Sequence, residues 1–238
     1  MTVLLMKLAG PMQAWGTESR YKRRTTGAEP SKSGVLGLLA AAQGRRRADP
    51  ITDLVNLRFG VRTDQPGRVL QDFQTAHSLT TGRPMPLTTR YYLADAVFVA
   101  AIEGEESFLE TLGEALQSPA YAPFLGRRAF APTSPIGIGL VSSSLQQALK
   151  DHPWEASDWF KKKSRGRYSA QVNVDALGWE ENAVPDLDRV SEDRVQDVPV
   201  SWDMDHRQYH WRPVKRYWVP LGEGGRVPIG TDWMAGTL

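Results

Sequence analysis

The sequence contains no cysteine, and several kinds of site are thereby excluded. A disulfide framework, a thiolate zinc site, an iron–sulfur cluster and a cysteine nucleophile all require that side chain. No apolar run approaches the ~18 residues of a membrane-spanning helix, so no membrane partner is expected. The short apolar run at the N-terminus has neither the basic flank nor the cleavage pattern of a secretory signal. We therefore expect a soluble, cytoplasmic protein.

Net charge is also small, +2 over 238 residues, but the charge is unevenly distributed. Residues 1–50 hold nine Lys or Arg against three Asp or Glu, and residues 151–200 hold seven against eleven. Such asymmetry is typical of proteins that bind polyanions. Solvated surface loops would explain it equally well. With 41% apolar and 24% charged residues, the chain otherwise has an ordinary globular composition.

Hydrophobic periodicity predicts an α+β fold with the order β-α-β-β-α-β. The predicted elements are a strand over 3–8, a helix over 33–44, a strand over 55–61, a long strand from 90 to 102, a helix opened by a capping box at Ser107-x-x-Glu110, and a strand over 136–141. This order is that of the ferredoxin-like fold, which RNA-recognition motifs share. Residues 142–238 are predicted to form a second, small and mostly β domain.

Two connections within residues 1–141 are unusually long, 9–30 and 63–89. Loops well beyond ~12–15 residues are usually functional or disordered. The second connection is rich in polar and turn residues, so we predict a protruding hairpin there.

No catalytic arrangement is convincing, and we expect neither an enzyme nor a cofactor or metal. Gly27 to Ser33 lacks the second glycine of a phosphate loop, and Ser19-x-x-Lys22 lacks its companion motifs. His206 and His210, or Asp203 and Asp205, have metal-like spacing without a complete ligand set. A loop histidine, His77, is most simply a surface residue.

Anion-binding patterns are stronger. Ser31, Lys32 and Ser33 lie at a predicted helix start, where free amides and hydroxyls bind phosphate; an ordinary N-cap is the alternative. Tyr121 and Phe124 precede an arginine pair, a mixture that suits single-stranded RNA. Core aromatics beside a surface arginine pair would give the same pattern. The basic stretch 161–167 is predicted to be a mobile solvated loop, with backbone contact as the second interpretation.

Four blocks, LAGPMQAWG at 8–16, PSKSGVLGLLA at 30–40, RYYLADA at 90–96 and PFLGRR at 123–128, resemble one known family. The family is that of the CasD subunits of type I-E CRISPR Cascade complexes, within the RAMP superfamily. Its members hold the 5′ handle of the guide RNA (crRNA). The resemblance covers 8–128 well and the C-terminal region only loosely. It implies a modified ferredoxin-like domain over 1–141, with a projecting thumb at 63–89, and a small C-terminal domain.

The resemblance also implies partners and site residues. The family caps the CasC backbone filament, contacts the large subunit CasA, and meets target DNA through the assembled complex. Site residues implied here are Arg90 and the aromatics Tyr121 and Phe124 near the handle, with Arg127 and Arg128 facing the RNA backbone. Phe124 stands where the family usually has tyrosine. From the basic N-terminal stretch we add Arg23 and Arg24 as RNA contacts.

Two alternatives stay open. A metal-independent endoribonuclease would process precursor crRNA, but the Tyr, Lys and His of the cleaving branch cannot be placed in this sequence, and CasE performs that step in this subtype. A protein-interaction subunit whose basic loops do not touch RNA is the second alternative.

Overall fold

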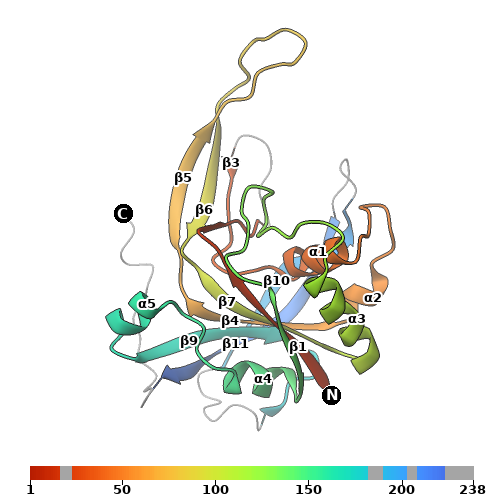
Figure 1. Ribbon diagram of the computed structural model, residues 1–238, viewed down its shortest axis with the longest axis vertical. Coiled ribbons are helices and arrows are strands. Elements are labelled where there is room, and N and C mark those ends of the chain that lie inside the picture. Colours follow the sequence, from red (N-terminus) through yellow and green to blue (C-terminus); the bar gives the residue numbers. More distant parts are fainter. Residues whose placement is uncertain (17–22, 182–189, 203–207, 223–238) are drawn as a thin grey trace.

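A computed structural model describes residues 1–16, 23–181, 190–202 and 208–222. It is an α+β fold built on a seven-stranded sheet in the order β10-β11-β9-β4-β7-β1-β8 (Figure 1). The strands of this main sheet are β1 (Thr2–Ala9), β4 (Arg58–Gln65), β7 (Val97–Gly104), β8 (Gly137–Ser142), β9 (Arg167–Asp175), β10 (Ser191–Ser201) and β11 (Gln208–Gly222). Every neighbouring pair is antiparallel.

A smaller sheet stands beside the main one. It contains β2 (Met12–Gln13), β3 (Arg23–Arg24), β5 (Arg68–Gln74) and β6 (Thr88–Ala94), with β6 pairing to the other three. Strands β5 and β6 form a hairpin that projects from the body of the protein (Figure 1). Its first strand exposes Val69, Leu70 and Phe73, so the hairpin displays apolar side chains that the described chain does not cover.

The helices cover both faces of the main sheet. Helices α1 (Lys32–Ala42) and α3 (Glu106–Gln117) share one core cluster, and α4 (Leu145–Asp151) belongs to another. Successive side chains of a strand point to opposite faces, and β1 divides its side chains accordingly. Leu4, Met6 and Leu8 join the cluster of α1 and α3, whereas Val3 and Leu5 join that of α4. The predicted strand over 3–8 is confirmed, and it is buried on both faces.

The predicted strand over 55–61 begins too early. A short helix, α2 (Thr52–Val55), precedes it, and β4 starts only at Arg58. Ile51, Leu54 and Leu57 are all buried. Their spacing of three residues places them on one face of a helical turn, and this competes with the alternation that predicted a strand.

The predicted long strand from 90 to 102 is wrong, because it is two strands in two sheets. The break falls at Asp95, whose φ is +56°, between β6 and β7. Aspartate adopts this left-handed conformation more readily than most residues. The apolar alternation continues across the break, so the sequence conceals it.

Helix α3 begins differently from the prediction. Glu105 is the N-cap, and its carboxylate accepts hydrogen bonds from the amides of Ser107 and Phe108. The prediction of a capping box that begins at Ser107 is therefore wrong. The buried stripe is Leu109, Leu112 and Leu116, and Phe108 is only partly buried at the edge of the core.

The main sheet continues past the predicted domain boundary at residue 141. Gly60 of β4 pairs with Val174 of β9, so residues on both sides of the boundary share one sheet. A division at this point stays a prediction about folding units. No helix in the described ranges combines the length and apolarity needed to span a membrane.

Candidate nucleic-acid interface

Pairing of β3 with β6 brings three predicted RNA contacts, Arg23, Arg24 and Arg90, to one surface. The two strands are parallel, with Arg23 beside Thr89 and Arg24 beside Arg90. Residues that lie far apart in the sequence thus become cross-strand neighbours. Arg23 also donates a hydrogen bond to the Tyr91 hydroxyl at 3.0 Å, and its guanidinium lies 5.3 Å from the centre of that ring.

A fourth arginine reaches this surface from the loop over 120–130. The Arg127 guanidinium lies 5.1 Å from the ring centre of Tyr92, the buried neighbour of Tyr91 in β6. The loop is anchored by the amide of Ala14, which donates to the Leu125 carbonyl at 3.1 Å. Gly126 has φ +84°, and a Cβ there would lie 1.7 Å from the Ala14 oxygen. Only glycine can hold the chain this close to its neighbour.

We call Arg24, Arg90 and Arg127 the arginine cluster. Burial lowers the pKa of Arg127, and the charges of Arg90 and Arg24 lower it further, although Tyr92 acts in the opposite direction. The Nε atoms of Arg90 and Arg127 are buried without a hydrogen-bond partner among the described residues. No ion pair within the described ranges engages any of the three arginines.

The cluster is therefore a concentration of positive charge that no carboxylate of the described chain approaches within ion-pair distance. Asp72 of β5 lies across the hairpin from Arg90, but its carboxylate accepts hydrogen bonds from Gln74 at 2.9 Å and from Tyr92 at 3.4 Å. Guanidinium groups without an ion-pair partner can bind phosphate groups through their paired N–H donors.

The same loop presents the other predicted residues at the surface. Tyr121 is 50% exposed and Phe124 is 37% exposed, and Arg128 is exposed beside them. The loop's core contacts come instead from Leu125 and Phe130, which are buried. The loop thus combines exposed rings and positive charge, whereas its neighbouring apolar side chains hold it to the core.

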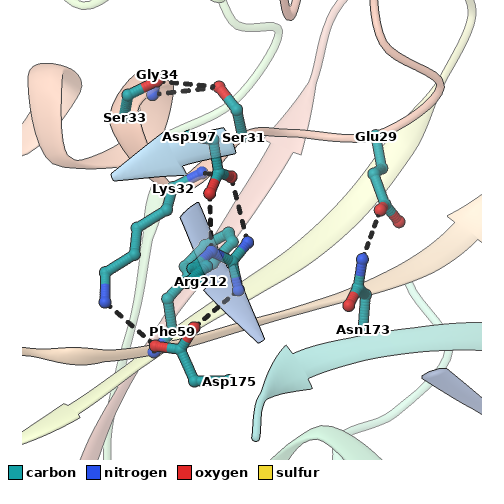
Figure 2. A network of polar contacts seen from close by, with 10 residues as sticks. All are labelled: Glu29, Ser31, Lys32, Ser33, Gly34, Phe59, Asn173, Asp175, Asp197 and Arg212. Carbon is teal, nitrogen blue, oxygen red and sulfur yellow. Dashed lines mark hydrogen bonds and ion pairs between the residues drawn. The ribbon is translucent and has the colours of Figure 1, made fainter. Parts of the chain in front are cut away.

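Ser31, Lys32 and Ser33 lie in a different environment, shown in Figure 2. Ser31 caps α1 by accepting a hydrogen bond from the Gly34 amide at 3.2 Å. The Lys32 amide donates to Asp197 of β10 at 2.7 Å, and its ammonium pairs with Asp175 of β9 at 3.0 Å. The anion at this helix start is therefore a carboxylate of the protein itself.

Arg212 completes this network. Its guanidinium donates twice to Asp197, at 2.6 and 3.0 Å, and once to Asp175 at 2.6 Å (Figure 2). Burial lowers the pKa of Arg212, but the hydrogen bonds and charges of Asp197 and Asp175 outweigh it and raise the pKa above its ordinary value. Lys32 is only 6% exposed. The geometry thus gives Lys32 a structural partner and offers no support for the predicted phosphate contact of Ser31, Lys32 and Ser33.

Within the described ranges, the candidate catalytic residues do not form a site. His77 lies in the projecting hairpin, where it bridges to Pro84 and is exposed. Ser19 and Lys22, and the positions 203–206 of the metal-like pattern, lie outside the described residues. No group of three His, Cys, Asp or Glu that could hold a metal occurs in the part of the chain that is described.

Sequence reasoning missed the tyrosines that organise the surface. Tyr91 and Tyr92 of β6 contact Arg23 and Arg127 respectively. Both were visible in the block RYYLADA, but only the pairing of β6 with β3 and the position of the Arg127 loop show which arginines they meet.

A basic surface edged by exposed aromatic rings is typical of proteins that bind single-stranded nucleic acid. A family model described as CRISPR-associated protein (Cas_Cas5) matches residues 3–215. The chain belongs to this family of CRISPR-associated proteins.

Individual relatives agree with this assignment. The CRISPR system Cascade subunit CasD of Escherichia coli strain K12 is 33% identical over 183 residues, which cover 68% of this chain and 81% of the relative. A solved chain described as a CRISPR RNA-guided surveillance complex superposes with a TM-score of 0.73 at 30% identity, over 98% of this chain and 96% of its own. A crystal structure of a Cas protein gives a TM-score of 0.68 at 32% identity, over 93% and 98% of the two chains.

Proposed function

We propose that this protein is a non-catalytic, crRNA-binding subunit of a CRISPR antiviral surveillance complex of the Cascade type, and that it holds the 5′ handle of the guide RNA. Family membership and the similarity to a Cascade CasD subunit support this assignment. The arginine cluster is the observation that assigns this function to particular residues. Three cations from separate segments lie together, and no ion pair in the described chain engages them.

Each group in the interface has a distinct task in this proposal. Arg24, Arg90 and Arg127 neutralise the phosphates of the handle, together with Arg23 and Arg128 at the edges. Tyr121 and Phe124 stack against unpaired bases. The hydroxyl-free ring of Phe124 contributes stacking alone.

The architecture supports roles for the other parts. Strands β4, β7, β1 and β8 are adjacent in that order, and α1 and α3 occupy the two crossovers, as in a ferredoxin-like unit. The projecting β5–β6 hairpin would then be the family's thumb. Its exposed apolar side chains suit contact with protein neighbours, so we assign it to capping the CasC filament. The remaining proposed partners are CasA and, through the assembled complex, target DNA. A cytoplasmic location, which a cysteine-free sequence favours, belongs to the same proposal.

The test uses the full chain and a labelled RNA that carries the 5′ handle of the CRISPR repeat from the same genome. The variant Arg90→Gln with Arg127→Gln is compared with a matched control, Arg46→Gln with Arg47→Gln, whose side chains are exposed near the end of α1. Each lost phosphate contact on a single strand removes roughly 0.7 from the slope of log K against log salt. The cluster variant should therefore lose about 1.4 in slope, and the control should lose little. Equal losses in both variants would contradict the site.

A further inference from the structure

A second basic surface lies at the end of α5 (Asp158–Lys163) and in the turn that leads into β9. We call Trp159, Lys162, Lys163, Arg165 and Arg167 the α5 patch. The sequence favoured a mobile solvated loop here, but the backbone is hydrogen-bonded throughout the turn. The amide of Arg165 donates to the Lys162 carbonyl at 3.0 Å, and the amide of Arg167 donates to that of Ser164 at 3.0 Å.

An aromatic cluster fixes the helix beneath these charges. Phe160 meets Trp154 and Tyr168 edge to face, with ring centres 6.2 and 5.4 Å away. Trp154 and Tyr168 are themselves stacked at 5.7 Å, with 6° between their planes. The patch is thus displayed from a packed platform, so binding there need not order a flexible segment.

The charged side chains of the patch are exposed in the described part of the chain. Lys162, Lys163, Arg165 and Arg167 are exposed, and no ion pair within the described ranges engages them. Trp159 is 47% exposed and touches Phe160 at one edge. Lysines at the C-terminal end of a helix also favour the helix itself through its dipole. That explanation covers the lysines but neither the two arginines nor the exposed tryptophan.

The patch is separate from the arginine cluster. Its platform residues Trp154 and Tyr168 pack against the core cluster of α4. Leu125 and Phe130, which hold the Arg127 loop, belong to the core cluster of α1 and α3 on the opposite face of the sheet. In Figure 1, α5 lies where β9 begins, below the lower end of the β5–β6 hairpin and apart from β3.

We propose that the α5 patch is a second contact for single-stranded nucleic acid, distinct from the handle site. The lysine and arginine side chains bind successive phosphates, and the Trp159 ring stacks on a base. An exposed aromatic ring beside cations is the combination that single strands need, because a duplex keeps its base faces covered.

The experiment uses the full chain carrying Arg90→Gln and Arg127→Gln, so that binding at the handle site is weakened and the second site is measured. Labelled 20-nucleotide oligouridine, 20-nucleotide oligothymidine and a 20-base-pair DNA duplex are the probes. Into this background we place Lys162→Gln, Lys163→Gln and Arg167→Gln together, or Trp159→Ala alone. The matched control is Arg46→Gln, Arg47→Gln and Arg194→Gln, which removes three exposed charges elsewhere.

The triple α5 variant should bind the preferred single strand at least tenfold more weakly, and its salt slope should fall by about 2, roughly 0.7 for each phosphate contact. Trp159→Ala should weaken binding about 5- to 100-fold without changing the slope. Melting temperatures of the α5 triple and the control should match. Preference for oligouridine or for oligothymidine identifies the strand as RNA or DNA.

Three results would overturn the proposal. The first is that the background protein does not bind a single strand at low salt. The second is that it binds the duplex more tightly than either single strand. The third is that the triple α5 variant and the control lose equal affinity for the single strand. A wrong assignment of the handle site would give a different result. In that case the protein with Arg90→Gln and Arg127→Gln would bind handle RNA as tightly as the unsubstituted protein does.

Discussion

Replacement of Lys32 by methionine separates a structural lysine from an RNA contact. The side chain lies at the start of α1, is 6% exposed, and holds Asp175 at 3.0 Å. Methionine has similar length and no charge, so it removes the ion pair with little change in volume. Asp175 keeps its bonds from Arg212 at 2.6 Å and from the Phe59 amide at 2.9 Å.

The expected loss in the free energy of unfolding depends on which hydrogen bonds the two carboxylates keep. A hydrogen bond to a charged group contributes about 1.5–3 kcal/mol, and Lys32→Met removes one such bond while Asp175 remains compensated. Arg212→Met removes three hydrogen bonds and leaves Asp197 with only the Lys32 amide among the contacts of this network. Breaking a buried ion pair by removing one partner costs about 3–5 kcal/mol. Arg212→Met should therefore be the more destabilising change.

Thermal unfolding and RNA binding measure the two roles on the same proteins. For a chain of this size each kcal/mol shifts the melting temperature by about 2–4 °C, so Lys32→Met should lower it by roughly 3–12 °C and Arg212→Met by roughly 6–20 °C. The salt slope of handle binding by folded Lys32→Met should not change. An unchanged melting temperature, together with a slope reduced by about 0.7, would refute the structural role and restore the phosphate contact.

Three further predictions concern the proposed interface. Phe124→Ala should weaken handle binding by about 1–3 kcal/mol with an unchanged salt slope, because stacking carries no charge; loss of melting temperature with intact affinity would place the ring in the core instead. Replacing residues 75–87 at the hairpin end by a tight turn should preserve the main sheet, because that segment lies between β5 and β6. The same change should weaken co-purification with the backbone subunit. A circular dichroism spectrum of an unfolded protein would show instead that the hairpin supports the core. Incubation with labelled repeat RNA should give no specific cleavage, with or without divalent metal; cleavage that disappears in His77→Ala would favour the endoribonuclease.

Helices and strands could be predicted where residues close in the sequence determine the local structure. Ser31 was placed at a predicted helix start with an N-cap as one interpretation. It does cap α1, because an N-cap hydrogen bond reaches only three residues along the chain. The apolar run over 3–8 likewise predicted a strand, which the structure has as β1. Asp95 shows the limit of such patterns. A single left-handed residue divides β6 from β7 while the alternation of side chains passes through undisturbed.

The site could be predicted as residues but not as an arrangement. Arg24 was selected from the basic N-terminal stretch, Arg127 from the arginine pair that follows two aromatic residues, and Arg90 only through the family resemblance. They lie together because β3 pairs with β6 and Gly126 lets the loop approach Ala14. Lys32 shows the converse. Its partners Asp175 and Asp197 come from β9 and β10, and no pattern around residue 32 indicates that two distant carboxylates meet there.

Photo-crosslinking of the assembled complex, followed by mass spectrometry of the peptides joined to its guide RNA, tests the central claim most directly. The account predicts crosslinks from the 5′ end of the RNA to the loop over 120–130, at Tyr121 or Phe124, and to β6 near Arg90. Crosslinks from that RNA end to other parts of the chain, with none to the loop or to β6, would contradict it.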